Sequence, residues 1–130
     1  MRGQLALHVD LSRGSHRRVG LDAVGSFVGA VDACLDPVGL GLVGDPGGPV
    51  TAIGNGPLGG SAVPGTNHLA VATYSPLWQG AYVAGIAGAG LPFDGLGCTP
   101  VVMSGRAARP SVLLLASRAG TVHMRLEPLD

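Results

Sequence analysis

Two cysteines and four histidines are the side chains of this sequence best suited to metal or nucleophilic chemistry, and their spacing gives no ligand set. Cys34 and Cys98 lie far apart, each within apolar sequence, so we expect both to be buried packing thiols. Without a CxxC motif or paired histidines, the chain by itself offers no ligands for an iron–sulfur cluster or a structural zinc. His8, His16 and His123 are expected to face solvent from strands.

Two further patterns give no chemical motif. The eight Asp and Glu residues are scattered, and no two are close enough in sequence to nominate an acid and a base. Residues 39–44 (GLGLVG) spell GxGxxG, but a dinucleotide site needs that motif to join a strand to a helix. The segment that follows, residues 45–49 (DPGGP), does not allow a helix to begin there. The residues alone therefore predict no active site.

Hydrophobic spacing predicts the elements that would position any site. Asp22 is placed to cap a helix whose apolar residues run at helical spacing from Val24 to Leu35, and Asp36-Pro37 ends it. The segment from Gly85 to Gly97 is expected to be irregular. Alternating or continuous apolar runs predict strands at residues 5–11, 16–19, 50–53, 68–74, 81–84, 100–103, 111–116 and 121–127. We expect an α+β fold in one domain over residues 1–130, with mostly antiparallel, bent sheet and one helix near the N-terminus.

Composition excludes several classes of protein. Hydrophobic residues make up 46% of the chain and charged residues 12%, which excludes a solvated disordered chain. The formal net charge is zero, so we expect neither a nucleic-acid partner nor an anionic membrane partner. No apolar stretch approaches the length of a membrane span and no secretory leader is visible, so a cytoplasmic location is expected. The low charge also suggests that a partner covers part of the surface.

Three stretches, in order, carry a resemblance to a known family. They are residues 9–14 (VDLSRG), residues 53–65 (IGNGPLGGSAVPG), and a segment that begins at residues 72–77 (ATYSPL) and ends at residues 97–105 (GCTPVVMSG). These stretches resemble V(N/D)LSTG, GPLTGT, TKSPLTG and GYDAIVVEG in the N-terminal domain of the tungsten- or molybdenum-dependent aldehyde ferredoxin oxidoreductases. The resemblance covers most of the chain.

In that family the N-terminal domain is the base on which a bis-pterin tungsten or molybdenum cofactor lies. The resemblance implies that glycine-rich backbone in residues 56–65 and 85–97 comes close to the pterins. The residues expected nearest the cofactor are Asn67, His68, Gly85, Gly88 and Gly90. Two departures reduce the polar contacts: His68 occupies the place of an Arg that clamps a pterin phosphate, and residues 84–88 (AGIAG) lack the Asn that helps to hold the bridging magnesium.

The resemblance implies a small subunit or detached domain of such an oxidoreductase, not catalytic alone. A larger chain would supply the iron–sulfur cluster, the acid–base residues and the pocket for a substrate such as an aldehyde, which is oxidised to an acid or formed in reverse. The alternative is a cofactor-free structural or assembly module that reuses the same fold, and a third reading is a diverged binder of a small ligand. Expected partners are a larger oxidoreductase subunit or a second copy of the chain.

Overall fold

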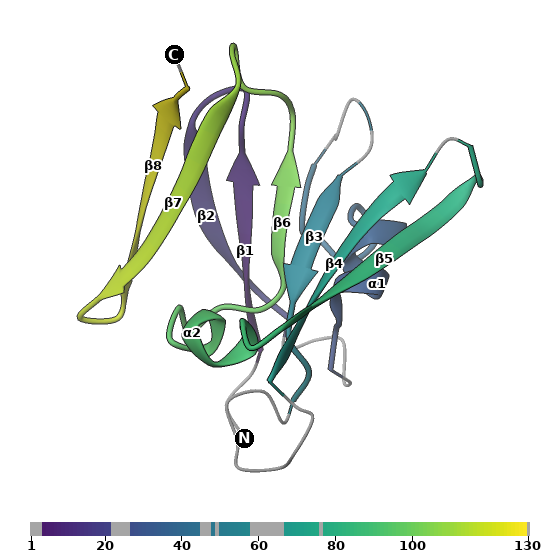
Figure 1. Ribbon diagram of the computed structural model, residues 1–130, viewed down its shortest axis with the longest axis horizontal. Helices are drawn as coiled ribbons and strands as arrows, with labels where there is room; N and C mark the ends of the chain where they lie inside the picture. Colours follow the sequence, from purple (N-terminus) through teal and green to yellow (C-terminus); the bar gives the residue numbers. More distant parts are fainter. Residues whose placement is uncertain are drawn as a thin grey trace.

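The computed structural model describes residues 4–21, 27–44, 48, 50–57, 67–75 and 77–129. In these parts of the chain, strands form one six-stranded sheet and one two-stranded sheet (Figure 1). The strand order of the larger sheet is β2-β1-β6-β3-β4-β5, and β7 pairs with β8 in the smaller one. The strands are β1 (Leu5–Asp10), β2 (Ser15–Gly20), β3 (Thr51–Gly54), β4 (His68–Ser75), β5 (Gly80–Ala87), β6 (Val101–Ser104), β7 (Ser111–Arg118) and β8 (Thr121–Pro128).

The pairing confirms the prediction of a mostly antiparallel fold. Every neighbouring pair is antiparallel except β1 and β6, which run parallel, with Leu7 opposite Val101. Each segment predicted as a strand overlaps one of the observed strands. Strand β6, late in the sequence, therefore lies between β1 and β3 and brings distant parts of the chain together.

The helices differ from the prediction. In the described part of the predicted N-terminal helix, residues 27–29 are not helical, and α1 (Ala30–Leu35) begins after Gly29, whose backbone N–H donates to Asp32 Oδ2 at 3.0 Å. Phe27 precedes the helix, and residues 22–26, with the predicted cap, lie outside the described residues. A second short helix, α2 (Gly90–Asp94), lies in the segment expected to be irregular. The expectation of one helix is therefore wrong in number.

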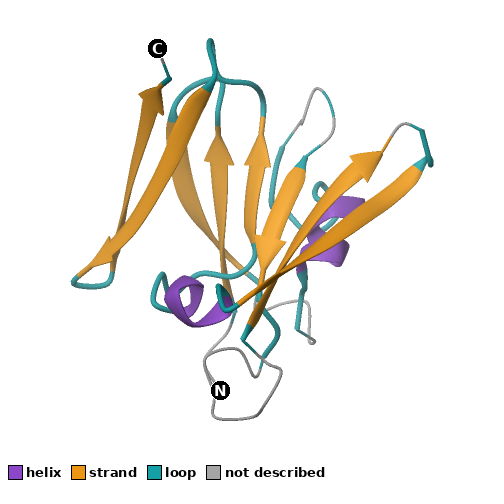
Figure 2. Cartoon of the chain, in the orientation of Figure 1, coloured by secondary structure: helices purple, strands orange, loops and turns teal. Residues whose placement is uncertain are grey.

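The two faces of the large sheet are buried by different elements. On β1, Ala6 belongs to a core cluster that includes Ala33 of α1, whereas Leu7 belongs to a second cluster. That second cluster includes Val122 of β8, with Phe93 of α2 packed against it. Alternate residues of a strand point to opposite faces, so α1 covers one face while β7, β8 and α2 cover the other. Figure 2 shows the two helices at separate positions around the sheet.

The thiols and histidines follow the sequence expectations with one exception. Cys34 and Cys98 are buried and free, as predicted, and burial raises the pKa of both thiols. His16 and His123 are exposed, as predicted, but His8 is half-buried. Its ring Nε2 lies 2.6 Å from Ser104 Oγ on β6. No helix in the described residues is long and apolar enough to cross a membrane.

Candidate functional site

The five residues predicted to lie near a cofactor come together at one end of the β4–β5 pair. Asn67 directly precedes β4, and His68, its first residue, is opposite Ala87 at the end of β5. Gly85 lies two residues earlier on β5, opposite Ala70. Gly88 and Gly90 follow β5 as the chain turns into α2. Antiparallel pairing of β4 with β5 therefore makes one cluster from two segments of the sequence.

Two of the glycines have a reason within the chain. The backbone carbonyl of Asn67 accepts hydrogen bonds from the N–H groups of Gly88 at 2.9 Å and Gly90 at 3.4 Å. Gly88 has a φ of +79°, which favours glycine. A Cβ at Gly90 would lie 3.0 Å from the backbone carbon of Asn67. The small size of these residues is explained by the tight turn from β5 into α2.

Gly85 and His68, in contrast, lie on the surface. Both are exposed, and a Cβ at Gly85 would meet nothing within 4 Å. Strand β5 is the edge of the sheet, so alternate backbone N–H and C=O groups along it point away from the β4 ladder. Gly85 thus presents backbone without a side chain beside the exposed His68. Of the other expected loop, residues 56–65, all but residues 56 and 57 lie outside the described residues.

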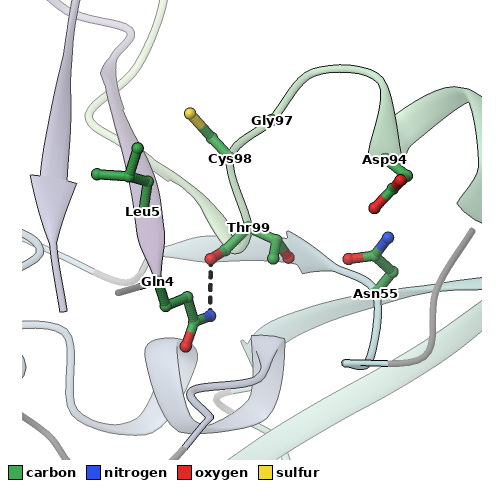
Figure 3. Close-up of a pocket in the computed structure, with 7 residues that line it drawn as sticks. All are labelled: Gln4, Leu5, Asn55, Asp94, Gly97, Cys98 and Thr99. Atoms are coloured by element: carbon green, nitrogen blue, oxygen red, sulfur yellow. Dashed lines mark hydrogen bonds between the residues drawn. The ribbon is translucent and has the colours of Figure 1, made fainter. Parts of the chain in front are cut away.

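A second polar site, not predicted from the sequence, lies at the other end of α2. It is a hollow of about 220 Å³ between the start of β1, the end of β3 and the segment between α2 and β6 (Figure 3). The residues that line it are Gln4, Leu5, Asn55, Asp94, Gly97, Cys98 and Thr99. Gly90 begins α2 and Asp94 ends it, so this short helix connects the two sites.

Two buried polar atoms in this hollow have no hydrogen-bond partner among the described residues: Asn55 Nδ2 and Thr99 Oγ1. Asn55 is only 6% exposed. Gly54 makes room for the hydroxyl, because a Cβ there would come within 3.1 Å of Thr99 Oγ1. Leaving a buried polar group unpaired costs about 1–3 kcal/mol. The hollow therefore holds hydrogen-bonding capacity that this part of the chain does not use.

Hydrogen bonds of the Gln4 side chain join the segments that surround the hollow. Gln4 Nε2 donates to the carbonyl oxygens of Val28 and Thr99, both at 2.7 Å, and Gln4 Oε1 accepts from the Val28 N–H at 2.8 Å. In Figure 3 the carboxylate of Asp94 faces the side-chain amide of Asn55 across the hollow. Donors and one carboxylate suit a small polar group, and no group of three or more His, Cys, Asp or Glu side chains that could hold a metal ion occurs in the described residues.

A signal for the second site was present in the sequence. Asn55 and Thr99 are polar residues inside two of the stretches that carried the family resemblance, residues 53–65 and 97–105. Both stretches otherwise consist mainly of glycine, proline and apolar residues. Their meeting depends on the antiparallel pairing of β3 with β6, which residue spacing does not reveal.

Comparison with known proteins gives one family. The model of the aldehyde ferredoxin oxidoreductase N-terminal domain matches residues 6–127, nearly the whole chain. A curated relative, glyceraldehyde-3-phosphate:ferredoxin oxidoreductase of Pyrococcus furiosus, is 36% identical over 66 residues, which is 51% of this chain and 10% of the relative.

A solved structure has a similar fold. It is a chain from the active site complex BamBC of benzoyl coenzyme A reductase, in complex with 1,5-dienoyl-CoA, and it matches with a TM-score of 0.71 at 20% identity. The match covers 97% of this chain and 20% of the other. This chain thus spans about a tenth of the curated relative and a fifth of the structural one.

Proposed function

This chain belongs to the aldehyde ferredoxin oxidoreductase N-terminal domain family, and on that basis we propose that it forms part of the surface that holds a bis-pterin tungsten or molybdenum cofactor. It does so together with a much larger portion of an oxidoreductase, which is either a separate partner subunit or a further part of the same polypeptide. When bound, the metal supplies a two-electron redox centre for oxidation of a substrate such as an aldehyde. The role of this chain is to position the cofactor rather than to react.

The observation that carries the proposal is the open backbone at Gly85 beside His68. Pterins are flat, polar rings, and their phosphates and ring atoms accept hydrogen bonds from backbone N–H groups that no side chain shields. Gly85 lies on an edge strand with no atom near its missing Cβ, and His68 is exposed on the adjacent strand. These residues fit a group approached through backbone donors and one imidazole.

The hollow at Asn55 adds support. Its unpaired Asn55 Nδ2 and Thr99 Oγ1 could donate to an acceptor at the edge of a bound group, as buried polar atoms are normally paired. The departures noted in the sequence are consistent with a reduced set of contacts: an imidazole replaces the forked guanidinium that grips a phosphate in two directions.

Exposed apolar side chains around β4 and β5 support the involvement of a larger partner. Leu77 and Trp78, in the turn between these strands, are 90% and 77% exposed, and Tyr82, Val83 and Ile86 follow on β5. Large exposed apolar areas on soluble proteins commonly mark interfaces. This apolar surface extends from the turn along β5, the strand that also carries Gly85.

The test is the pterin and metal content of the assembled complex. An affinity tag on this chain captures the complex from its native host, and pterin, tungsten and molybdenum are quantified against protein. We expect pterin with one of the two metals in the parent complex. Gly85→Val should reduce both severalfold, because the side chain would occupy the space of the approaching group. Gly44→Val is the control, an exposed glycine with open surroundings in the loop after α1, and it should leave both contents unchanged.

A second candidate, a cofactor-free structural or assembly module, is favoured by the turn at Asn67. Two of the three glycines in the cluster are accounted for by internal geometry, Gly88 by its positive φ and Gly90 by its contact with Asn67. Under this alternative the captured complex contains the larger partner without pterin or metal, and Gly85→Val assembles like the parent. Absence of pterin and metal from the captured parent complex would overturn the cofactor proposal, and so would unchanged pterin and metal contents in Gly85→Val.

A further inference from the structure

A cavity of about 190 Å³ lies at the far end of β1 from the hollow described above. It is formed by the β1–β2 hairpin and is lined by His8, Asp10, Arg13, Ser15, His16 and Arg17. Arg13, Arg17 and His8 supply N–H donors here against the single carboxylate of Asp10, whereas the ring of His16 lies 3.1 Å from the carbonyl oxygen of Val122. None of these side chains takes part in the proposed cofactor site.

The strand register explains why His8, Asp10, Ser15 and Arg17 meet. His8 is opposite Arg17, and Asp10 is opposite Ser15, in the antiparallel β1–β2 pair. Residues directly opposite each other share one face of the sheet, as do residues two apart on one strand. The parallel pairing of β1 with β6 places Ser104 beside Asp10 on the same face. One face of three strands thus carries a compact polar group.

The single carboxylate is already occupied by the hairpin turn. Asp10 Oδ1 accepts the backbone N–H groups of Ser12 at 3.0 Å and Arg13 at 3.1 Å, and Asp10 Oδ2 lies 3.8 Å from Arg13 Nε. Its negative charge therefore serves the turn and is partly balanced by Arg13. It leaves little acceptor capacity for the other groups in the cavity.

Donors, in contrast, are in excess. Arg17 uses Nη2 to donate to the carbonyl oxygen of Leu42 at 3.2 Å, which leaves most of its five N–H groups for another partner. His8 Nε2 is engaged with Ser104 Oγ, and no hydrogen bond within the described residues engages His8 Nδ1. Since the serine hydroxyl can donate to Nε2, the tautomer with hydrogen on Nδ1 presents one more donor.

From this arrangement we propose that the β1–β2 cavity binds a small oxyanion of the phosphate or sulfate type. Donors arrive from β1, β2 and the turn, which suits a tetrahedral group better than a planar carboxylate held by a single fork. A cation is disfavoured by Arg13 and Arg17. The same chemistry could come from a free anion or from the phosphate of a larger molecule.

The half-buried His8 provides a direct readout. Burial and, to a smaller extent, the positive charge of Arg17 lower its pKa, while Asp10 acts in the opposite direction. An anion bound beside the ring favours the imidazolium form, so binding must raise the pKa of His8. NMR titration of the purified chain, with sulfate as a probe that stays divalent across the range, measures that rise against chloride at equal ionic strength.

We expect saturable shifts of the His8 ring signals with sulfate and inorganic phosphate, a higher His8 titration midpoint, and neither effect with chloride. Arg17→Gln should weaken binding about tenfold or more. Arg13→Gln, an 84% exposed side chain, serves if Arg17→Gln fails to fold. Arg18→Gln is the matched control, because the adjacent Arg18 lies on the opposite face and donates to the carbonyl oxygen of Gly120.

The two sources of the anion are separated by adding a phosphate monoester. Tighter binding of the monoester than of inorganic phosphate identifies the cavity as a site for a phosphorylated molecule, and equal binding identifies a free-anion site. Shifts that follow ionic strength alike for sulfate and chloride would overturn the proposal. Unchanged sulfate binding in the Arg17→Gln and Arg13→Gln variants would do the same.

Discussion

Gly90 lies against Asn67 so closely that a Cβ atom on Gly90 would come within 3.0 Å of the backbone carbon of Asn67 and 3.1 Å of its Oδ1. The same Asn67 carbonyl accepts the N–H groups of Gly88 and Gly90. This contact joins the start of β4 to the start of α2, and thereby holds the two halves of the candidate site together.

The first prediction concerns this contact. Gly90→Ala should lower the free energy of unfolding by about 1–3 kcal/mol, the usual cost of forcing an extra carbon into a packed site. Urea unfolding followed by circular dichroism measures it. Gly44→Ala, at an exposed glycine with open surroundings, should change stability little. Equal unfolding midpoints for the two variants would show that Asn67 moves aside without cost.

His68 tests the cofactor proposal from the side chain. His68→Ala should reduce the pterin content of the captured complex, because loss of a donor to a charged oxygen costs about 1–3 kcal/mol. The exposed position of His68 predicts a smaller loss of stability than Gly90→Ala gives. His68→Arg, which restores the forked donor expected from the family, should raise the content above that of His68→Ala. Identical pterin content in all three proteins would remove His68 from the site.

Much of the sheet could be predicted from local sequence, because period-two alternation such as that of Leu5, Leu7 and Val9 fixes which residues face the core. Neither the position of β6 between β1 and β3 nor the meeting of Asn55 with Thr99 could be predicted in this way, since both depend on pairing between distant strands. Local sequence does not predict the helix α2, because Gly90 and Pro92 are poor helix formers. Pro92 is tolerated in the first turn, where backbone N–H groups have no partner within the helix.

The structure shows that the residues predicted to lie near a cofactor are neighbours, whereas their contact with a cofactor stays a prediction. The resemblance identified Gly85, Gly88 and Gly90 as one group, and the structure places them at one end of β4 and β5. It separates them by role, since Gly88 and Gly90 are required by the turn whereas Gly85 has open space. Sequence alone does not distinguish a glycine that is required because its φ is positive from one whose missing side chain leaves room for a ligand to approach the backbone.

Thr99 provides a third prediction, on stability. Its Oγ1 is buried and has no partner among the described residues, so Thr99→Val should leave the free energy of unfolding unchanged or raise it by about 1 kcal/mol. Thr51→Val is the matched comparison, because Thr51 Oγ1 donates to Thr73 Oγ1 at 3.3 Å and its loss should cost about 0.5–1.5 kcal/mol. A larger loss for Thr99→Val than for Thr51→Val would show that the Thr99 hydroxyl has a partner.

The surface around Trp78 gives a fourth prediction. The purified chain should self-associate or retain its partner, because Leu77, Trp78 and Tyr82 are all more than half exposed. Light scattering over rising concentration should show an increasing mass for the parent, and Trp78→Lys should reduce it by removing the largest apolar side chain and adding charge. Thr121→Lys, at the exposed start of β8, is the control. A parent that stays monomeric at high concentration without a partner would contradict the interface.

The last prediction follows from His8. Its pKa is lowered from the ordinary value of 6.5, first by burial and then by Arg17, so the unfolded chain binds a proton there more readily than the folded chain. Stability due to this residue is therefore complete above pH 6.5 and is lost as the pH falls through the lower pKa of the folded state. Urea midpoints measured between pH 7.5 and pH 5 should fall in the parent, and the fall should be smaller in His8→Gln, which does not titrate. His123→Gln, at an exposed histidine on β8, should keep the parent slope; a slope that His8→Gln leaves unchanged would show that His8 does not link folding to pH.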